Sequence, residues 1–509
     1  MGYNTLPYLV LFLPLSLIIY QVSGRNNRKY VLLIFSWIYF FLCSKKLIIY
    51  LLLTSAGVWL DGLAMQKSGG RKHLKTALAV LGVGGLFGVL LYLKYTNFFI
   101  GIVNTVMAGR GAGAAIPLRH MLVPIGISFY TLEAAGYLLE VYWGRQEADP
   151  DFVRVALFLG FFPQTMEGPI ARYQDTAHQL TGGKPVTEQQ LFDGVTRILW
   201  GMFKKIVIAD RLSLIVTELY RNYAAYNGIM IPAAAVTYTM QLYMEFSGVM
   251  DIVIGSAGIF GIALPENFRQ PFFSQSASEF WRRWHISLGV WLKTYLFYPV
   301  TTSGMTKKWN RFAGKKFGKY ITKIGTSFLA LTPVWLFNGL WHGASWHYIF
   351  YGVYYLVLLM IEVILEPAKK SFYKKTGFKK NGRFWTVFRI LRTWLIIFTG
   401  ELFFRAESLR AGIAMFRSGF HHIGIQRLWD GTLLKMGLDQ ADWLVILAGI
   451  AVVFAADLLK EKNFDIKASL AKKSLPVRWA AFYGLIFAVL IFGAYGPGYQ
   501  PVDLIYAGF

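Results

Sequence analysis

Three histidines lie close together in a stretch of the sequence that is otherwise apolar and aromatic. His285 belongs to the run EFWRRWHIS, and His342 and His347 belong to the run NGLWHGASWH. An imidazole inside hydrocarbon is costly unless it faces a partner or a wet cavity, so a histidine in a membrane-crossing chain is a candidate functional residue. Residues 279–347 are therefore the candidate functional site of the chain.

Acidic and thiol groups are scarce near these histidines. No Asp or Glu occurs between Phe280 and Ile361, and Cys43 is the single cysteine of the chain. A zinc centre needs three or four nitrogen, sulfur or carboxylate ligands, so the set is poor for a metal. A Ser-His-Asp triad would lack its acid, and the window has no Gly-x-Ser-x-Gly elbow. We therefore expect no metal and a histidine that acts as a general base, since its ordinary pKa suits that role.

The first histidine lies in a stretch with helical periodicity. On a helical wheel, residues 281–293 place Arg282, His285, Gly289 and Lys293 on one side, with tryptophans and leucines on the other. The pattern predicts one amphipathic helix whose basic side attracts phosphate groups. The alternative is an interfacial helix whose Arg and Lys meet lipid phosphates, with no chemical role for the histidine.

The second histidine has an amide four residues before it. Asn338 and His342 share a helix face at this spacing, so the amide can orient the ring or hold a substrate. The neighbours are expected to leave room for a ligand or to shield the ring from lipid: Gly339, Gly343, Trp341 and Trp346. The alternative is a core histidine satisfied by a backbone carbonyl.

Composition indicates a polytopic membrane protein. The 509 residues are 55% hydrophobic and 17% aromatic, and the mean hydropathy is +0.44. On the order of ten to twelve apolar runs approach the length that crosses a bilayer. The run 152–163 is short and is followed by Gly168-Pro169, which favours a re-entrant hairpin.

Charge follows the same pattern. The net charge of +25 would suggest nucleic acid in a soluble protein, but the basic residues form short blocks between apolar runs. Such blocks mark the cytoplasmic side of a membrane protein, and we discount nucleic acid. The block from Lys307 to Lys323 therefore meets lipid headgroups or, alternatively, an anionic cofactor.

Acidic residues also occur inside apolar runs. Glu245 and Asp251 lie in one long run, and Glu401 lies one turn from Arg405. Intramembrane acids need a cavity or a cationic partner, and we expect structural ion pairs. The same expectation applies to three further residues, Glu133, Glu140 and Glu167.

Several short motifs, taken in order, resemble one family. They are PIGISFY at 124–130, FFPQ at 161–164, GPIARY at 168–173, KK at 204–205, IADR at 208–211, FSG at 246–248, PENFRQP at 265–271, EFWRRWHISL at 279–288 and LWHGA at 340–344. Together they look like the membrane-bound O-acyltransferases, in the branch of alginate O-acetyltransferases, peptidoglycan O-acetyltransferases and teichoic acid D-alanylation proteins. The resemblance covers about residues 118–406.

The resemblance implies a fold and an activity. It implies an all-α polytopic bundle with re-entrant and amphipathic helices around a central tunnel, as one domain over residues 1–509 with a core at 118–406 and accessory spans at 1–117 and 407–509. The implied activity moves an acetyl group from cytosolic acetyl-CoA, a substrate and not a resident cofactor, across a bacterial plasma membrane. The implied acceptor is a cell-surface polysaccharide, reached through an extracytoplasmic SGNH-type partner.

The resemblance also assigns roles to residues. By resemblance His342 is the catalytic histidine and His285 is a second histidine of the tunnel. As chemistry, we expect Asn338 or a nearby donor to steady the oxyanion. The residues expected to hold acetyl-CoA are Arg282, Arg283, Lys293 and Trp341.

The sequence departs from the family pattern at several positions, such as YPVTTS at 298–303 where relatives carry Tyr-Ile-Pro-Leu-Gly-Gly. These departures leave the acceptor open. D-alanyl or another acyl transfer from a carrier protein is an alternative, and a proton-coupled transporter is a third reading.

Overall fold

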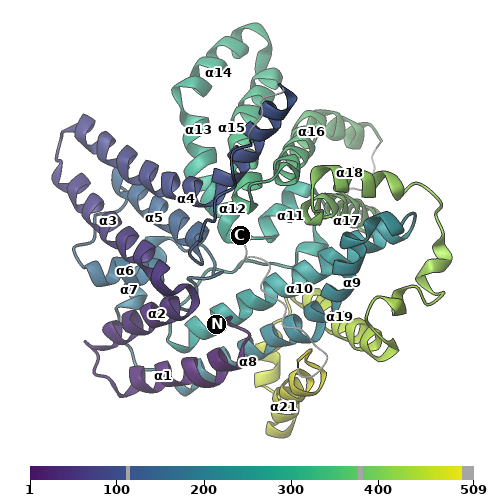
Figure 1. Ribbon diagram of the computed structural model, residues 1–509, viewed down its shortest axis with the longest axis horizontal. Helices are drawn as coiled ribbons and strands as arrows, with labels where there is room; N and C mark the ends of the chain where they lie inside the picture. Colours follow the sequence, from purple (N-terminus) through teal and green to yellow (C-terminus); the bar gives the residue numbers. More distant parts are fainter. Residues whose placement is uncertain (111–114, 377–381, 496–509) are drawn as a thin grey trace. The chain divides into compact units, whose positions relative to one another are not determined.

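The computed structural model describes residues 1–110, 115–376 and 382–495 (Figure 1). Within these ranges the chain forms helices and no β-strand, and one isolated bridge joins Phe268 and Trp284. The all-α prediction is confirmed.

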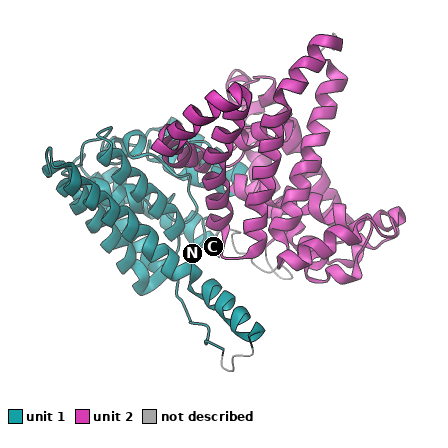
Figure 2. Cartoon of the chain, turned by 90° about the horizontal axis from the view of Figure 1, so that it is seen from above, with its two compact units in different colours: residues 1–201, 249–266, 503–509 teal, residues 202–248, 267–502 magenta. Residues whose placement is uncertain are grey.

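The described chain divides into two compact units (Figure 2). Among the described residues, unit 1 contains residues 1–201 and 249–266, and unit 2 contains residues 202–248 and 267–495. The helix α10, Met230–Ile259, belongs partly to each unit. The expected single domain with a core at 118–406 stays a prediction.

Six helical stretches of the described residues are long and apolar enough to cross a membrane. They are Arg28–Lys67, Lys72–Gly109, Met230–Ile259, Trp346–Thr376, Gln440–Glu461 and Leu475–Phe492, with a shorter apolar stretch at Pro7–Val22. The number is lower than the predicted number of apolar runs because two neighbouring runs fall in the one stretch Arg28–Lys67 and because irregular turns divide others. One of the predicted apolar runs, residues 191–218, is divided into α8, Glu188–Met202, a π-helical turn at Phe203–Ala209, and α9, Asp210–Arg221.

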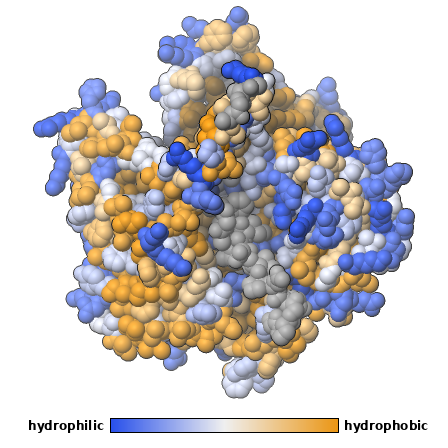
Figure 3. All heavy atoms as spheres, viewed as in Figure 1, coloured by the Kyte–Doolittle hydropathy of each residue, from blue (hydrophilic) through white to orange (hydrophobic). Residues whose placement is uncertain are grey.

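Unit 1 is built from helices, most of which pack against one another. They are α1 Leu13–Val22, α2 Arg28–Ser44, α3 Ile48–Lys67, α4 Lys72–Gly109, α5 Ile127–Tyr142, α6 Phe152–Gly160, α7 Tyr173–Leu180 and α8. Apolar side chains cover most of the surface over α1 to α3, at the left of Figure 3. Leu53 of α3, and Leu6 and Val10 just before α1, are more than 60% exposed. A surface of this kind is expected to face lipid.

The chain after α6 is buried without being helical. Residues 161–171 are buried, and Ala171 N–H and the Gln164 amide both donate to the Glu133 carboxylate, at 2.9 and 3.2 Å. Gly126, at a φ of 70°, lets the chain approach the Thr165 carbonyl so closely that a Cβ would lie 1.8 Å from that oxygen. A short helix followed by buried irregular backbone matches the form of the expected re-entrant segment, while its depth in a membrane stays a prediction.

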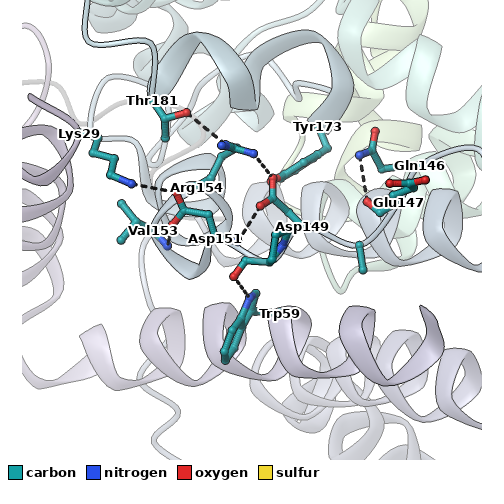
Figure 4. Close-up of polar contacts among 12 residues, drawn as sticks. Lys29, Trp59, Gln146, Glu147, Asp149, Asp151, Val153, Arg154, Tyr173 and Thr181 are labelled. Atoms are coloured by element: carbon teal, nitrogen blue, oxygen red, sulfur yellow. Dashed lines mark hydrogen bonds and ion pairs between the residues drawn. The ribbon is translucent and has the colours of Figure 1, made fainter. Parts of the chain in front are cut away.

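A cluster of charged groups fixes the start of α6 (Figure 4). Asp149 Oδ2 accepts hydrogen bonds from Tyr173 Oη and from Arg154, both at 2.6 Å. Asp151 caps α6 by accepting from Val153 N–H at 2.9 Å and pairs with Lys29 at 2.9 Å. A capped and paired start of this kind holds a short helix that could not form alone.

Unit 2 contains the predicted chemical residues. Its helices are α9, α11 Ala277–Arg283, α12 Ile286–Leu292, α13 Tyr298–Thr302, α14 Gly304–Lys316, α15 Gly318–His342, α16 Trp346–Thr376, α17 Arg383–Arg405, α18 Leu409–Ser418, α19 Gln440–Glu461, α20 Ile466–Ala471 and α21 Leu475–Phe492. Short 3₁₀ and π turns occupy Tyr223–Ala225, Pro271–Phe273, Lys293–Phe297, Ile425–Leu428 and Leu433–Lys435.

Three of the six intramembrane acids, Glu245, Asp251 and Glu140, form the expected ion pairs. Glu245 pairs with Lys205 at 3.1 Å, and Asp210 pairs with the same ammonium at 2.7 Å. Asp251 pairs with Arg197 at 2.9 Å in unit 1, where Glu140 also meets an arginine. Glu133 instead accepts hydrogen bonds from two uncharged donors, and Glu401 also differs from the prediction.

The partner of Glu401 is a phenol. Its Oε1 accepts a hydrogen bond from Tyr351 Oη at 2.9 Å. The guanidinium of Arg405 lies over the Tyr220 ring, 5.5 Å from its centre. Helix spacing alone therefore predicted the wrong partner.

Candidate active site

The helix predicted at residues 281–293 is broken at its histidine. α11 ends at Arg283, Trp284 is extended, and His285 has φ 46° and ψ 52°, in the left-handed region. α12 begins at Ile286. The prediction of one continuous amphipathic helix is wrong.

Hydrogen bonds to the segment 267–269 cause the break. Arg269 N–H donates to the Arg283 carbonyl at 2.9 Å, and Ile286 N–H donates to the Asn267 carbonyl at 3.0 Å. The Asn267 side chain also accepts from Ser287 N–H at 2.9 Å, as a helix cap does. These bonds satisfy backbone groups that a continuous helix would have paired internally.

The break decides where the side chains point. His285 is 3% exposed, among buried aromatic side chains. Arg282 and Lys293 are exposed. The histidine therefore does not share a face with the two cations, as the helical wheel had placed it.

Both histidines contact one indole ring. His342 is the last residue of α15 and is 4% exposed. The Trp341 ring lies with its centre 5.6 Å from that of His285 and 5.0 Å from that of His342. Residues 57 positions apart in the sequence are thus brought to the same buried ring.

Aromatic side chains surround each histidine. Phe246, from α10, lies edge-on to His285 with ring centres 4.9 Å apart. Phe404, from the end of α17, lies edge-on to His342 at the same separation. Tyr351 and Tyr348 of α16 follow, with ring centres 6.2 and 6.4 Å from that of His342. Sequence reasoning did not select these side chains, although Phe246 belongs to the FSG motif.

The expectation that two glycines leave room for a ligand is wrong. A Cβ on Gly339 would lie 2.3 Å from the Tyr348 carbonyl, and one on Gly343 would lie 2.5 Å from the Tyr348 ring. Gly352 approaches the Trp335 carbonyl equally closely. The glycines therefore serve close packing of α15 against α16, as small residues do between membrane helices.

The other two predicted neighbours of His342, Asn338 and Trp346, differ in burial. Asn338, one turn before His342, is buried. Trp346 is 55% exposed. The indole that shields the histidines within the buried cluster is thus Trp341.

The three predicted phosphate-binding cations occupy different settings. Arg283 pairs with Glu461 at 2.6 Å and with Glu279 at 2.8 Å, so an anion would have to displace two carboxylates. Arg282 is exposed, and the exposed Lys293 ammonium lies 5.5 Å from the centre of the Tyr298 ring. The basic block from Lys307 to Lys323 lies exposed on α14 and the first turns of α15.

The buried cluster around His285, Trp341 and His342 has groups that can transfer a proton. It contains two buried imidazoles and an aromatic wall, and the buried Asn338 amide lies one turn before His342. No group of three His, Cys, Asp or Glu suited to a metal occurs among the described residues. A neutral imidazole in such a place can take a proton from a hydroxyl, and buried donors act strongly on developing charge.

Residues 144–406 match the sequence model of the membrane-bound O-acyltransferase family, and this stretch contains His285, Trp341 and His342. The chain belongs to the membrane-bound O-acyltransferase family. It is similar to proteins named probable alginate O-acetylase AlgI from Pseudomonas putida, with 34% identity over 94% of this chain and 91% of that protein, and from Pseudomonas syringae pv. tomato, with 32% identity over 91% and 84%. It is also similar to a teichoic acid D-alanyltransferase of Bacillus subtilis, with 28% identity over 57% of this chain and 71% of that protein.

The family confirms the expected class of protein. This chain is a multi-pass membrane protein and an O-acyltransferase. Membership gives no support to the transporter reading. The roles of His342, His285, Asn338, Arg282, Arg283, Lys293 and Trp341 stay predictions.

Proposed function

We propose that this membrane-bound O-acyltransferase moves an acetyl group from acetyl-CoA to a hydroxyl of a cell-surface polysaccharide. The observation that carries the proposal is the buried cluster in which His285 and His342 contact Trp341, inside the stretch that matches the family. The names of the relatives from Pseudomonas support acetyl as the acyl group.

In the proposed reaction His342 is the general base. Its ring nitrogen takes the proton of the acceptor hydroxyl while the hydroxyl oxygen attacks the thioester carbonyl. The carbon–sulfur bond then breaks, the acyl group stays on the acceptor oxygen, and the thiolate of CoA receives the proton from the imidazolium. Asn338, buried one turn before His342, is the proposed donor to the developing oxyanion.

The proposed path crosses the membrane. Acetyl-CoA enters from the cytoplasmic side, where the basic residues are expected to lie. The acceptor binds on the opposite side of a bacterial plasma membrane. As the family resemblance implies, an SGNH-type protein would carry the acyl group onward to the polymer. His285 is the proposed second wall of the path, held against Trp341.

The choice of donor tests this proposal. The purified protein, reconstituted in lipid nanodiscs, is incubated in parallel with acetyl-CoA and with a D-alanyl carrier protein. Release of free thiol is measured, with water as the acceptor of the acyl group. We expect turnover of acetyl-CoA at least about ten times above that of the carrier, a difference that corresponds to about 1.4 kcal/mol in the barrier. Turnover of the carrier alone would establish D-alanyl transfer, the alternative that the Bacillus subtilis relative supports, and would refute acetyl transfer.

The exposed cations provide a second prediction. If Arg282 and Lys293 hold the phosphates of CoA, the Arg282→Gln and Lys293→Gln variants raise KM for acetyl-CoA by about five- to tenfold each and leave kcat nearly unchanged, because the lost contacts exist before and during the reaction. The matched control is Arg283→Gln, since Arg283 is paired with Glu279 and Glu461. It is expected to lower thermal stability more than donor affinity. Unchanged KM in both Arg282→Gln and Lys293→Gln would remove these residues from the donor site.

A further inference from the structure

One buried carboxylate from outside the acid-free window bonds to an aromatic side chain beside His342. Glu401, on α17, is 1% exposed, and its Oε1 accepts the hydrogen bond of Tyr351 Oη at 2.9 Å. A buried carboxyl is expensive to keep, so its retention beside a candidate active site calls for a physical role.

The hydrogen bond joins the two helices that form the aromatic seat of His342. The seat consists of Tyr348, Tyr351 and Phe404. Tyr348 and Tyr351 lie one turn apart on α16, and Glu401 and Phe404 lie one turn apart on α17. The Phe404 ring lies 4.9 Å from both His342 and Tyr351, measured between ring centres. It lies 5.1 Å from Tyr348.

The bond therefore fixes the register of the seat. If α17 shifted by a fraction of a turn relative to α16, the Glu401 oxygen would leave Tyr351 and the Phe404 ring would leave His342. Gly400, next to Glu401, allows this close approach, because a Cβ there would lie 2.5 Å from Tyr355 Oη. Glycine and carboxylate together bring α17 against the tyrosine face of α16.

We propose that Glu401 is a positioning residue for His342: through its hydrogen bond to Tyr351 it sets the ring contacts that orient the catalytic imidazole. The inference rests on the proposed function. The carboxylate acts as a hydrogen-bond acceptor, so an amide oxygen at the same place can replace it.

Steady-state kinetics on the full-length protein in nanodiscs test the proposal. Glu401→Leu and Tyr351→Phe each lower kcat by about tenfold or more, with KM for acetyl-CoA within about twofold of the wild type, because a misplaced base affects the reaction more than donor binding. Glu401→Gln keeps kcat within about threefold, since its oxygen still accepts from Tyr351. In the double variant the losses do not add, as expected for two ends of one bond.

Tyr354→Phe is the matched control. Its hydroxyl donates to the Ile396 carbonyl at 2.8 Å, also between α16 and α17, and its ring packs on Phe350 and Tyr355, which are not members of the seat defined above. We expect Tyr354→Phe to keep kcat. Should Glu401→Leu fail to fold, Tyr351→Phe and Glu401→Gln still give the answer.

Three results would overturn the positioning role: unchanged kcat in Tyr351→Phe, equal loss in Glu401→Gln and Glu401→Leu, or an equal loss in Tyr354→Phe. His342→Ala, measured in parallel, separates the two proposals. Activity in His342→Ala refutes the proposed role of that histidine, whereas an inactive His342→Ala beside a fully active Tyr351→Phe refutes the positioning role alone.

Discussion

Replacing His342 with alanine is expected to reduce transfer of the acyl group by at least about 100-fold, the usual contribution of a general base. The imidazole is buried against Trp341 and Phe404. Removing it leaves the acceptor hydroxyl without a group to take its proton. Thiol release from acetyl-CoA by protein in nanodiscs measures the effect.

The matched control for this variant is His347→Ala. The His347 ring shares a 2.8 Å hydrogen bond with Ser345 at the start of α16 and packs on Tyr348. We expect this variant to keep most of the turnover. Equal losses in the two variants, or turnover by folded His342→Ala near that of the wild type, would contradict the role of His342 as the base.

Replacing Lys205 with methionine is expected to give the largest loss of stability. Its ammonium is fully buried and pairs with Asp210 at 2.7 Å and Glu245 at 3.1 Å. Removing one partner of a buried ion pair leaves uncompensated charge and costs about 3–5 kcal/mol of unfolding free energy. Thermal unfolding of the detergent-solubilised protein, followed by loss of monodisperse protein, measures the effect.

The control for Lys205→Met removes the carboxylates as well. In the triple variant Lys205→Met, Asp210→Asn and Glu245→Gln no charge of the cluster remains, so we expect much of the lost stability to return. A single variant as stable as the wild type would show that the cluster does not stabilise unit 2. A triple variant no more stable than the single one would show that the uncompensated charge is not the cause.

The acidic residues show which partners the local sequence can predict and which it cannot. The apolar runs around Glu245 and Asp251 predicted ion pairs, and the structure has them. Spacing favoured Arg405 as the partner of Glu401, yet the hydrogen bond goes to Tyr351, 50 positions away. Helical periodicity records which residues share a face of one helix, but not which face of another helix meets it.

The break at His285 is a second example. Residues 281–293 have the periodicity of a helix. Neither neighbour of His285 is a Gly or Pro that would predict the end of a helix there. The segment 267–269 competes for the backbone hydrogen bonds and turns the histidine inward. Tertiary contacts of this kind override local propensity.

The sequence by itself determined that this protein is an all-α membrane protein with O-acyltransferase motifs, because hydropathy and motif order are properties of the chain. It also selected His285 and His342, since polar imidazoles are rare in apolar segments. Only the tertiary structure placed both against Trp341 and surrounded His342 with Tyr348, Tyr351 and Phe404. The reason is that those neighbours come from helices whose packing depends on close glycine contacts and hydrogen bonds between distant segments, which no local pattern encodes.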